Sequence, residues 1–179
     1  MNKENKMRSL RISKVTLNIG MGEAGEKLQK AKKLLETIAG VKAVITKSNK
    51  RIPSWGVRPG LEIGTKCTLR GEPALVVLKK MLEAKEFILD ERNFDNNGNL
   101  SFGIKEYIDI PGAEYDPSLG VIGMDVCVTI ERQGYRVKKR KIRSKTLPRK
   151  HIVKKEESIE FISKLFDVKI KTQAKGETQ

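Results

Sequence analysis

Residues 46–71 read TKSNKRIPSWGVRPGLEIGTKCTLRG, and the two halves of this stretch have different patterns. From Leu61 to Leu69, apolar or small side chains alternate with polar or charged ones, which predicts a strand with a cationic outer face. The first half is an irregular basic loop, interrupted by two prolines and holding the only tryptophan, Trp55. A basic loop joined to such a strand is typical of surfaces that bind phosphates and stack bases.

The segments on either side of this stretch predict the rest of a single core domain, residues 8–131. Alternation or helical periodicity predicts a strand around residues 15–19, a helix at 26–39, a short strand at 43–47, a helix at 73–88, a strand at 100–110 and a last strand at 122–131. This β-α-β-β-α-β order with an additional strand predicts an α+β fold with a largely antiparallel sheet. Both helices are expected on one face of the sheet, which leaves the other face open for a partner.

The same periodicities predict which side chains are buried. Leu75 is expected in the buried stripe of the second helix, and Leu165 in the docking face of a final helix at 156–166. In the last strand Val126 and Val128 are expected to face inward, and Glu131 outward. The outward residues expected on the open face include Thr16, Asn18, Lys66, Thr68 and Arg70.

A basic arm follows the core, because residues 132–155 hold twelve Lys or Arg and no acid. The like charges of such a segment repel one another, so we do not expect it to be ordered alone. We expect it to become ordered when RNA phosphates neutralise these charges. The arm and the final helix form a second unit, residues 132–171, and residues 1–7 and 172–179 are expected to be flexible tails. The arm residues expected to contact phosphates are Arg136, Lys138, Lys139, Arg140, Lys141, Arg143, Arg149 and Lys150.

The net charge of +15 favours a polyanionic partner over a merely solvated basic surface, because the charge is concentrated in a few segments. No apolar run is long enough for a membrane span, and the N-terminus lacks a hydrophobic signal core, so we expect an intracellular protein without a membrane partner. Cys67 and Cys127 both lie in strand-like alternations without a CxxC spacing, which argues against a zinc site. A disulfide between them would require neighbouring strands.

The main competing interpretation is an enzyme. Residues 20–25, GMGEAG, match the GxGxxG of dinucleotide sites between a predicted strand and a predicted helix. Glu23 would repel a pyrophosphate, and the next strand ends in a lysine where the pattern needs an acid, so a tight turn is favoured and the dinucleotide-binding enzyme stays the alternative.

Other catalytic interpretations are weaker still. The acids Asp109, Glu114 and Asp116 are interpreted as loop residues rather than metal ligands, and His151, the only histidine, as a phosphate contact or an exposed side chain. Without paired acids or a catalytic histidine, an RNA nuclease is disfavoured, although an RNA chaperone stays open. We therefore predict a protein that is not an enzyme and has no cofactor, metal or small-molecule substrate.

Three long motifs then match a known family. They are IxKVTLNIGxGEA at 12–24, ITKSNKRIPSWGVRPGLEIGTKCTLRG at 45–71 and DERNFDNNGNLSFGIKEYIDIPGAEYD at 90–116. In this order they resemble the 5S rRNA-binding family of large-subunit ribosomal proteins, protein five of that subunit. The resemblance runs from about residue 8 to residue 168, and the arm and final helix are similar to those of the archaeal and eukaryotic branch, with an N-terminus of archaeal type.

The resemblance implies a cytoplasmic, ribosomal protein of the central protuberance that anchors 5S rRNA to 23S rRNA. It also implies contacts with P-site tRNA, with neighbouring large-subunit proteins and with a small-subunit head protein. By position, Asn18 and Thr68 match residues implied in 5S rRNA contact, and residues 50–60 match the loop that approaches tRNA. Bacterial members have Gln where this chain has Val41, so no RNA hydrogen bond is expected there.

The resemblance implies that the eight arm residues named above contact rRNA. Together the residue patterns and the resemblance define two further candidate sites. The 5S rRNA site comprises Thr16, Asn18, Lys47, Lys66, Thr68 and Arg70. The site for tRNA or 23S rRNA lies in the basic loop, residues 47–60, and comprises Lys50, Arg51, Trp55 and Arg58.

Overall fold

A computed structural model describes residues 5–117 and 119–171 of the chain. Its main sheet has five strands in the order β2-β3-β1-β6-β5, and every neighbouring pair is antiparallel. The strands are β1 (Leu10–Gly20), β2 (Val44–Lys47), β3 (Glu62–Leu69), β5 (Leu100–Ile104) and β6 (Met124–Arg132). Antiparallel pairing throughout confirms the predicted largely antiparallel α+β fold.

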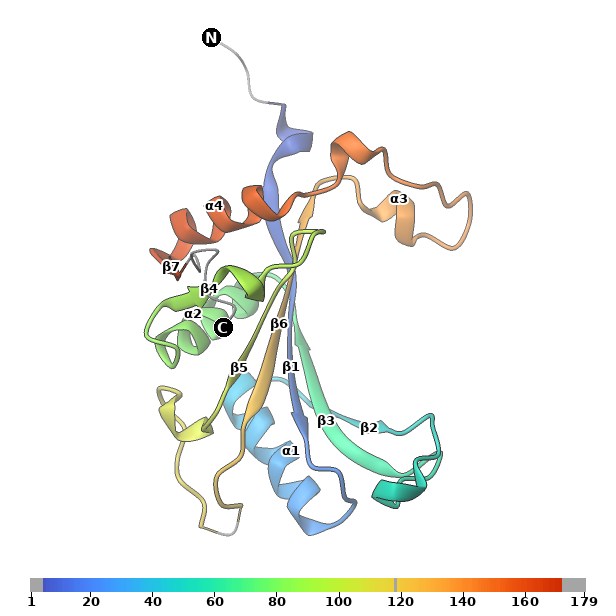
Figure 1. The fold of residues 1–179 in the computed structure, drawn as a ribbon, viewed down its shortest axis with the longest axis vertical. Coiled ribbons are helices and arrows are strands. Elements are labelled where there is room, and N and C mark those ends of the chain that lie inside the picture. The colour runs from blue at the N-terminus through green and yellow to red at the C-terminus, as the bar shows by residue number, and fades with distance from the viewer. Residues whose placement is uncertain (1–4, 118, 172–179) are drawn as a thin grey trace, which may run out of the picture.

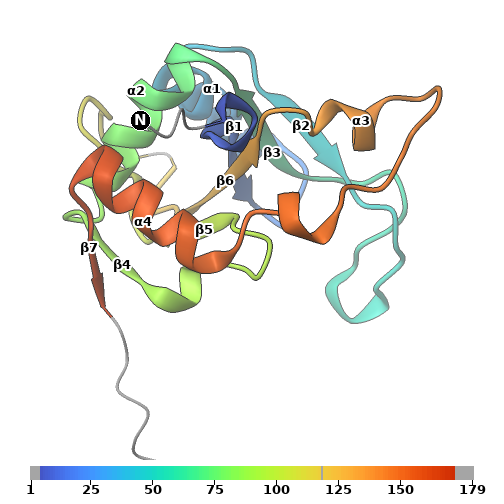
Figure 2. The same cartoon turned by 90° about the horizontal axis from the view of Figure 1, so that it is seen from above.

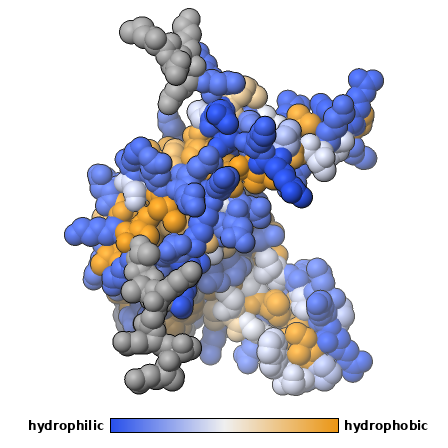
Figure 3. All heavy atoms as spheres, turned by 45° about the horizontal axis from the view of Figure 1, so that its top comes forward, coloured by the Kyte–Doolittle hydropathy of each residue, from blue (hydrophilic) through white to orange (hydrophobic). Residues whose placement is uncertain are grey.

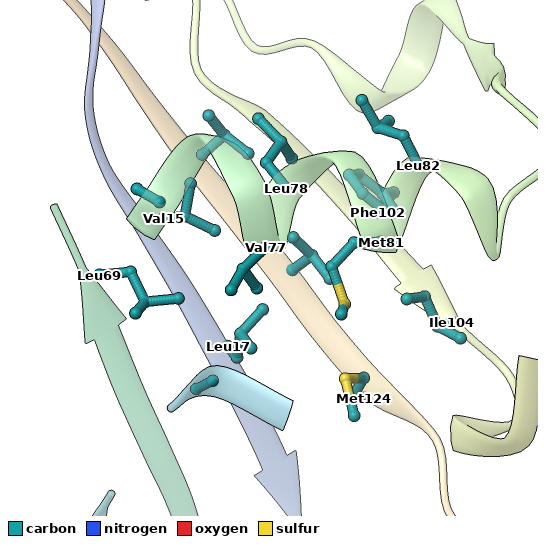
Figure 4. Close-up of a cluster of buried hydrophobic side chains, with 14 of the residues drawn as sticks. Val15, Leu17, Leu69, Val77, Leu78, Met81, Leu82, Phe102, Ile104 and Met124 are labelled. Atoms are coloured by element: carbon teal, nitrogen blue, oxygen red, sulfur yellow. The ribbon is translucent and has the colours of Figure 1, made fainter. Parts of the chain in front are cut away.

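Helices α1 (Glu26–Ala39) and α2 (Glu72–Glu83) lie on one side of this sheet (Figures 1 and 2). The core forms between them and the inward rows of the strands. In Figure 4, Leu78 and Met81 of α2 point toward Leu17 of β1 and Phe102 of β5, and all four side chains are almost completely buried. The inward rows alternate with outward polar residues, which is the pattern of an antiparallel sheet covered on one face only.

The C-terminal part of the chain adds a second layer to the core beside β5. Helix α4 (Lys155–Phe166) buries Ile162, and the parallel pair of β4 (Ile88–Asp90) and β7 (Lys169–Lys171) lies next to it (Figure 1). The hydroxyl of Ser158 donates to the carbonyl oxygen of Gly98 at 2.8 Å. This bond ties α4 to the turn that precedes β5.

The remaining elements are short. The arm contains α3 (Arg136–Lys139), and single 3-10 turns lie at Lys6–Arg8, Pro53–Trp55, Glu91–Asn93, Tyr107–Asp109 and Arg149–His151. Of the predicted flexible tails, residues 1–4 and 172–179 lie outside the described residues. Asn5 caps the first 3-10 turn, and Lys6 and Met7 belong to it.

The first helix agrees with its predicted bounds, whereas two other predicted elements are too long. Helix α2 ends at Glu83 instead of residue 88, because Glu86 and Phe87 adopt positive φ angles of 54° and 55° and turn the chain into β4. Strand β5 ends at Ile104, and the residues after Lys105 form a 3-10 turn rather than the predicted strand to residue 110.

Three predictions of side-chain burial are wrong. Leu75 and Leu165 are exposed, because α2 and α4 each bury a narrower stripe than the sequence pattern predicts. Glu131, expected to be exposed on the outward face of β6, is buried. The arm that follows β6 folds back over this carboxylate, so it is covered by chain that sequence periodicity does not place.

The fold also removes the basis for a dinucleotide site at residues 20–25. Strand β1, which leads into this turn, has antiparallel neighbours on both sides, whereas a dinucleotide fold needs a parallel sheet with a crevice at its strand ends. Gly22 and Gly25 have φ angles of 75° and 143°, which only glycine adopts readily. The glycines therefore serve the strand-to-helix turn.

Candidate RNA interface

The outward face of the sheet is a polar surface built from cross-strand rows. Asn18 of β1 lies between Lys66 of β3 and Asp125 of β6, and its side-chain amide donates to the Asp125 carboxylate at 3.4 Å. In the next row Thr16 lies between Thr68 and Cys127. We call the surface made by Lys14, Thr16, Asn18, Lys66, Thr68, Asp125, Cys127 and Thr129 the open face.

The structure brings together four of the six residues predicted for 5S rRNA. Thr16, Asn18, Lys66 and Thr68 form two adjacent rows of the open face, whereas Arg70 lies just beyond the end of β3. The sixth, Lys47, ends β2 and pairs with Glu62 at 3.4 Å, so part of its charge is already neutralised. The prediction that these residues contact RNA stays a prediction.

One exposed apolar residue of this surface was missed from the sequence. Val44 of β2 lies opposite Lys66 and is 61% exposed, although it belongs to a strand. A signal did exist, because the alternation of β2 places residue 44 on the same face as Lys66 once the register is known. Its exposed side chain offers a base or sugar an apolar contact next to a cation.

The basic loop projects from the end of the sheet where β1 ends and β3 begins (Figure 1). Its tip is closed by two backbone hydrogen bonds between Ile52 and Val57, at 2.9 and 3.1 Å, and Val57 is buried beneath it. Trp55 is 75% exposed, so its ring is not packed into the core. Lys50, Arg51 and Arg58 are exposed around it, so the tip presents one ring among three cations.

The basic arm leaves the opposite end of the sheet, and Figure 3 shows it and the basic loop as two separate, mostly hydrophilic projections. All eight arm residues predicted to contact rRNA are exposed. Lys139 differs from the other seven, because its ammonium group pairs with the buried carboxylate of Glu131. Lys139 therefore has a partner within the chain, besides any contact it makes with RNA.

The arm is anchored at its start by a second buried charge, Arg132. Its guanidinium contacts both carboxylate oxygens of Glu157 at 2.6 Å and the carbonyl oxygen of Lys150 at 3.4 Å. Burial raises the pKa of Glu157. The backbone N–H of Lys154 and the side chain of Arg132 lower the pKa by more than burial raises it, so the net pKa is below its ordinary value. The carboxylate is therefore held ionised by the arm.

Two rings complete the anchoring. The hydroxyl of Tyr135 accepts a hydrogen bond from the backbone of Val153 at 3.1 Å and donates to the carbonyl oxygen of His151. The imidazole of His151 contacts the carbonyl oxygen of Gln133 at 2.8 Å. This histidine is half-buried and holds the arm together, so the interpretation as a merely exposed side chain is wrong.

The two cysteines lie on opposite faces of the sheet, Cys67 in the core and Cys127 on the open face. Both thiols are free, and β1 separates their strands. Burial raises the pKa of the Cys127 thiol, Asp125 raises it further and Lys14 lowers it. Among the described residues, no group of three His, Cys, Asp or Glu side chains could hold a metal ion.

Two family models together match most of the chain. The model described as "Ribosomal protein L5" matches residues 5–58, and a second model, for the C-terminus of the same ribosomal family, matches residues 62–161. The chain belongs to the ribosomal L5 family. The boundary between the two matches falls at the end of the basic loop, so the second match begins with β3.

Curated relatives from archaea agree with this assignment. The chain is 52% identical to "Large ribosomal subunit protein uL5" of Sulfolobus acidocaldarius, over 94% of each chain. The same protein of Nanoarchaeum equitans is 49% identical over 93% of this chain and 99% of its own, and that of Methanococcus vannielii 46% identical over 92% of each.

Family membership makes the chain a structural component of the large ribosomal subunit and not an enzyme. This confirms the predicted ribosomal family and ends the case for the dinucleotide-binding alternative. No helix in the described part of the chain is long and apolar enough to cross a membrane.

Proposed function

We propose that this L5-family protein binds 5S rRNA on the open face and anchors it to 23S rRNA in the central protuberance of the large subunit. The observation that carries the proposal is a sheet face that no helix of the described residues covers and that presents Asn18, Thr68 and Lys66 in adjacent rows. A positively charged group neutralises phosphates, and side-chain amides and hydroxyls bond sugars or unpaired bases. The face therefore combines attraction to any RNA with groups that read its shape.

The two projections extend this function to other partners. The arm supplies further contacts with rRNA, since seven of its eight predicted contact residues are exposed cations without an ion-pair partner among the described residues. The basic loop, with Trp55 at its tip, contacts P-site tRNA or 23S rRNA. The exposed loops elsewhere on the core contact neighbouring large-subunit proteins and a small-subunit head protein.

The first test is filter binding of 5S rRNA to the full chain at several salt concentrations. Affinity should fall by about 0.7–0.9 log units per log unit of salt for each phosphate neutralised. 5S rRNA should outcompete an unrelated structured RNA of equal length. Equal binding of both RNAs would reduce the proposal to general RNA affinity.

Variants locate the site on the open face. Asn18→Ala with Thr68→Ala should lower 5S rRNA affinity about ten-fold, because both hydrogen-bonding groups are lost from adjacent rows. Lys66→Ala should reduce the salt slope by about one phosphate contact. Lys33→Ala is the matched control, because it removes an exposed cation from α1 on the covered side of the sheet. Equal losses from Lys66→Ala and Lys33→Ala would move the site away from the open face.

Trp55 tests the loop separately. Base stacking on an aromatic side chain contributes about 1–3 kcal/mol, so Trp55→Ala should weaken tRNA binding to the loaded ribosome about ten-fold, whereas Trp55→Phe should retain most of it. Tryptophan fluorescence should change when tRNA docks. Because the ring is exposed, the free energy of unfolding should not change by more than about 0.5 kcal/mol. Unchanged tRNA affinity and fluorescence would remove the ring from the contact.

A further inference from the structure

A hollow of about 460 Å³ lies where β6 ends, between the turn that precedes β5 and the basic arm. Its lining includes Asn97 and Asn99 from the turn, Thr129 and Glu131 from β6, and Tyr135 and Lys138 from the arm. The volume falls within the range of roughly 300–1,000 Å³ typical of small-ligand sites. The hollow continues the open face, because Thr129 and Glu131 follow Asp125 and Cys127 in the same outward row of β6.

The chemistry of the hollow differs from that of the rest of the basic surface. Glu131 is 5% exposed, and only its Oε1 is hydrogen-bonded, to Lys139, among the described residues. A carboxylate repels phosphate and accepts hydrogen bonds only from N–H or O–H donors. On RNA, such donors are the Watson–Crick edges of unpaired bases and the 2′-hydroxyls. Guanine fits best, because it presents two adjacent N–H groups to a carboxylate.

The other walls suit a base and its sugar. The Tyr135 ring is held in place by the two hydrogen bonds of its hydroxyl, so a base could stack on it without ordering the ring. The side chains of Asn97 and Thr129 make no hydrogen bond to any described residue and are free to bond a base edge or a 2′-hydroxyl. Lys138 lies at the rim, where a flanking phosphate would pass.

We propose that this hollow receives a single unstacked nucleotide, a guanine, extruded from the 5S rRNA that lies on the open face. The inference rests on the proposed function, since the RNA must lie on the open face for one of its bases to reach Glu131. The base would bond Glu131 with its Watson–Crick edge, stack on Tyr135 and leave its phosphates to the lysines of the arm. The hollow would then add base-specific recognition to a surface that otherwise reads shape.

The test is chemical footprinting of guanine N1 and N2 in 5S rRNA bound to the full chain, with filter binding measured in parallel. The wild type should protect one unpaired guanine from kethoxal. Thr129→Val with Asn97→Ala keeps the Glu131–Lys139 pair and should restore the reactivity of that guanine. Glu131→Gln should do the same and weaken binding about ten-fold. Thermal melting of each variant shows whether the fold is kept.

The outcomes separate this inference from the proposed function. If the wild type binds 5S rRNA but no guanine changes reactivity between the wild type and the Thr129→Val/Asn97→Ala variant, the hollow is not a base site and the proposed function stands. If the wild type does not bind 5S rRNA, both fail. Guanosine monophosphate that binds the hollow as tightly as the RNA does would assign the site to a free nucleotide instead.

Discussion

The basic loop and the basic arm have similar compositions but are held in different ways. The loop is closed by backbone hydrogen bonds, and its one ion pair, between Lys47 and Glu62, is largely exposed. The arm is anchored by two buried charges, Glu131 and Arg132, each paired with a group from the arm or from α4. The positive charge of a segment therefore does not show how the segment is ordered. A few acids outside the loop and the arm decide which cations are structural.

The largest loss of stability is expected from a substitution that removes the anchoring of the arm. Arg132→Ala removes a buried guanidinium and the two contacts that one of its nitrogens makes with the Glu157 carboxylate. Loss of one partner of a buried pair typically costs about 3–5 kcal/mol. Because Glu157 is partly exposed and can be rehydrated, we expect the free energy of unfolding to fall by about 2–3 kcal/mol in urea titrations. Trypsin should also cleave the arm sooner than in the wild type.

Lys47→Ala is the matched variant in the basic loop. It also removes one member of an ion pair, but both side chains of that pair are substantially exposed. Exposed pairs contribute about 0–1 kcal/mol, so stability and the rate of cleavage in the arm should stay close to those of the wild type. Equal losses from the two variants would contradict the distinction between the loop and the arm.

A smaller effect tests where the arm returns to the core. Gly98→Ala would place a Cβ 2.4 Å from the hydroxyl oxygen of Ser158 and 2.7 Å from a methyl carbon of Val153, at a φ of +78°. Backbone strain and overpacking each cost about 1–3 kcal/mol, so we expect a loss of about 2 kcal/mol.

Gly56→Ala in the basic loop is the control for Gly98→Ala. Gly56 has a φ of +66°, but its Cβ would meet nothing within 4 Å. It therefore carries the backbone strain alone, a loss of about 1 kcal/mol. If Gly98→Ala costs no more than Gly56→Ala in the same denaturation assay, α4 is not packed against the turn as the structure shows.

The parts of the fold that sequence could predict are those fixed by local periodicity. The alternation of Val15, Leu17 and Ile19 and the helical stripe of α1 each determine one element and its buried face. The end of α2 could not be predicted in the same way, because two residues that are neither Gly nor Asn, Glu86 and Phe87, adopt positive φ there. Tertiary packing holds that turn, and the local sequence carries no signal for it.

The candidate site divides in the same manner. The alternation of inward and outward side chains along each strand was enough to place Thr16, Asn18 and Thr68 on one surface. It could not reveal that Glu131 and Arg132 are buried, because their partners, Lys139 and Glu157, lie 8 and 25 residues further along the chain. Long-range ion pairs depend on how the arm folds back, and the hollow beside Glu131 depends on the same folding.

The smallest expected effect is the pH dependence of the free energy of unfolding that arises from the Glu157 contact with the arm. The pKa of Glu157 is lowered in the folded protein, so the unfolded chain binds more protons at this site as the pH falls. Its contribution is present above the unfolded pKa of about 4.3 and is lost as the pH falls through the lower folded value. The stability difference between the wild type and Glu157→Gln should therefore shrink below about pH 4. Urea titrations at pH 7, 5, 4 and 3 measure this stability difference. Glu62→Gln, at the exposed ion pair of the basic loop, is the control, and its stability should stay within about 0.5 kcal/mol of the wild type. A difference that grows as the pH falls would show that desolvation of Glu157 outweighs its hydrogen bonds.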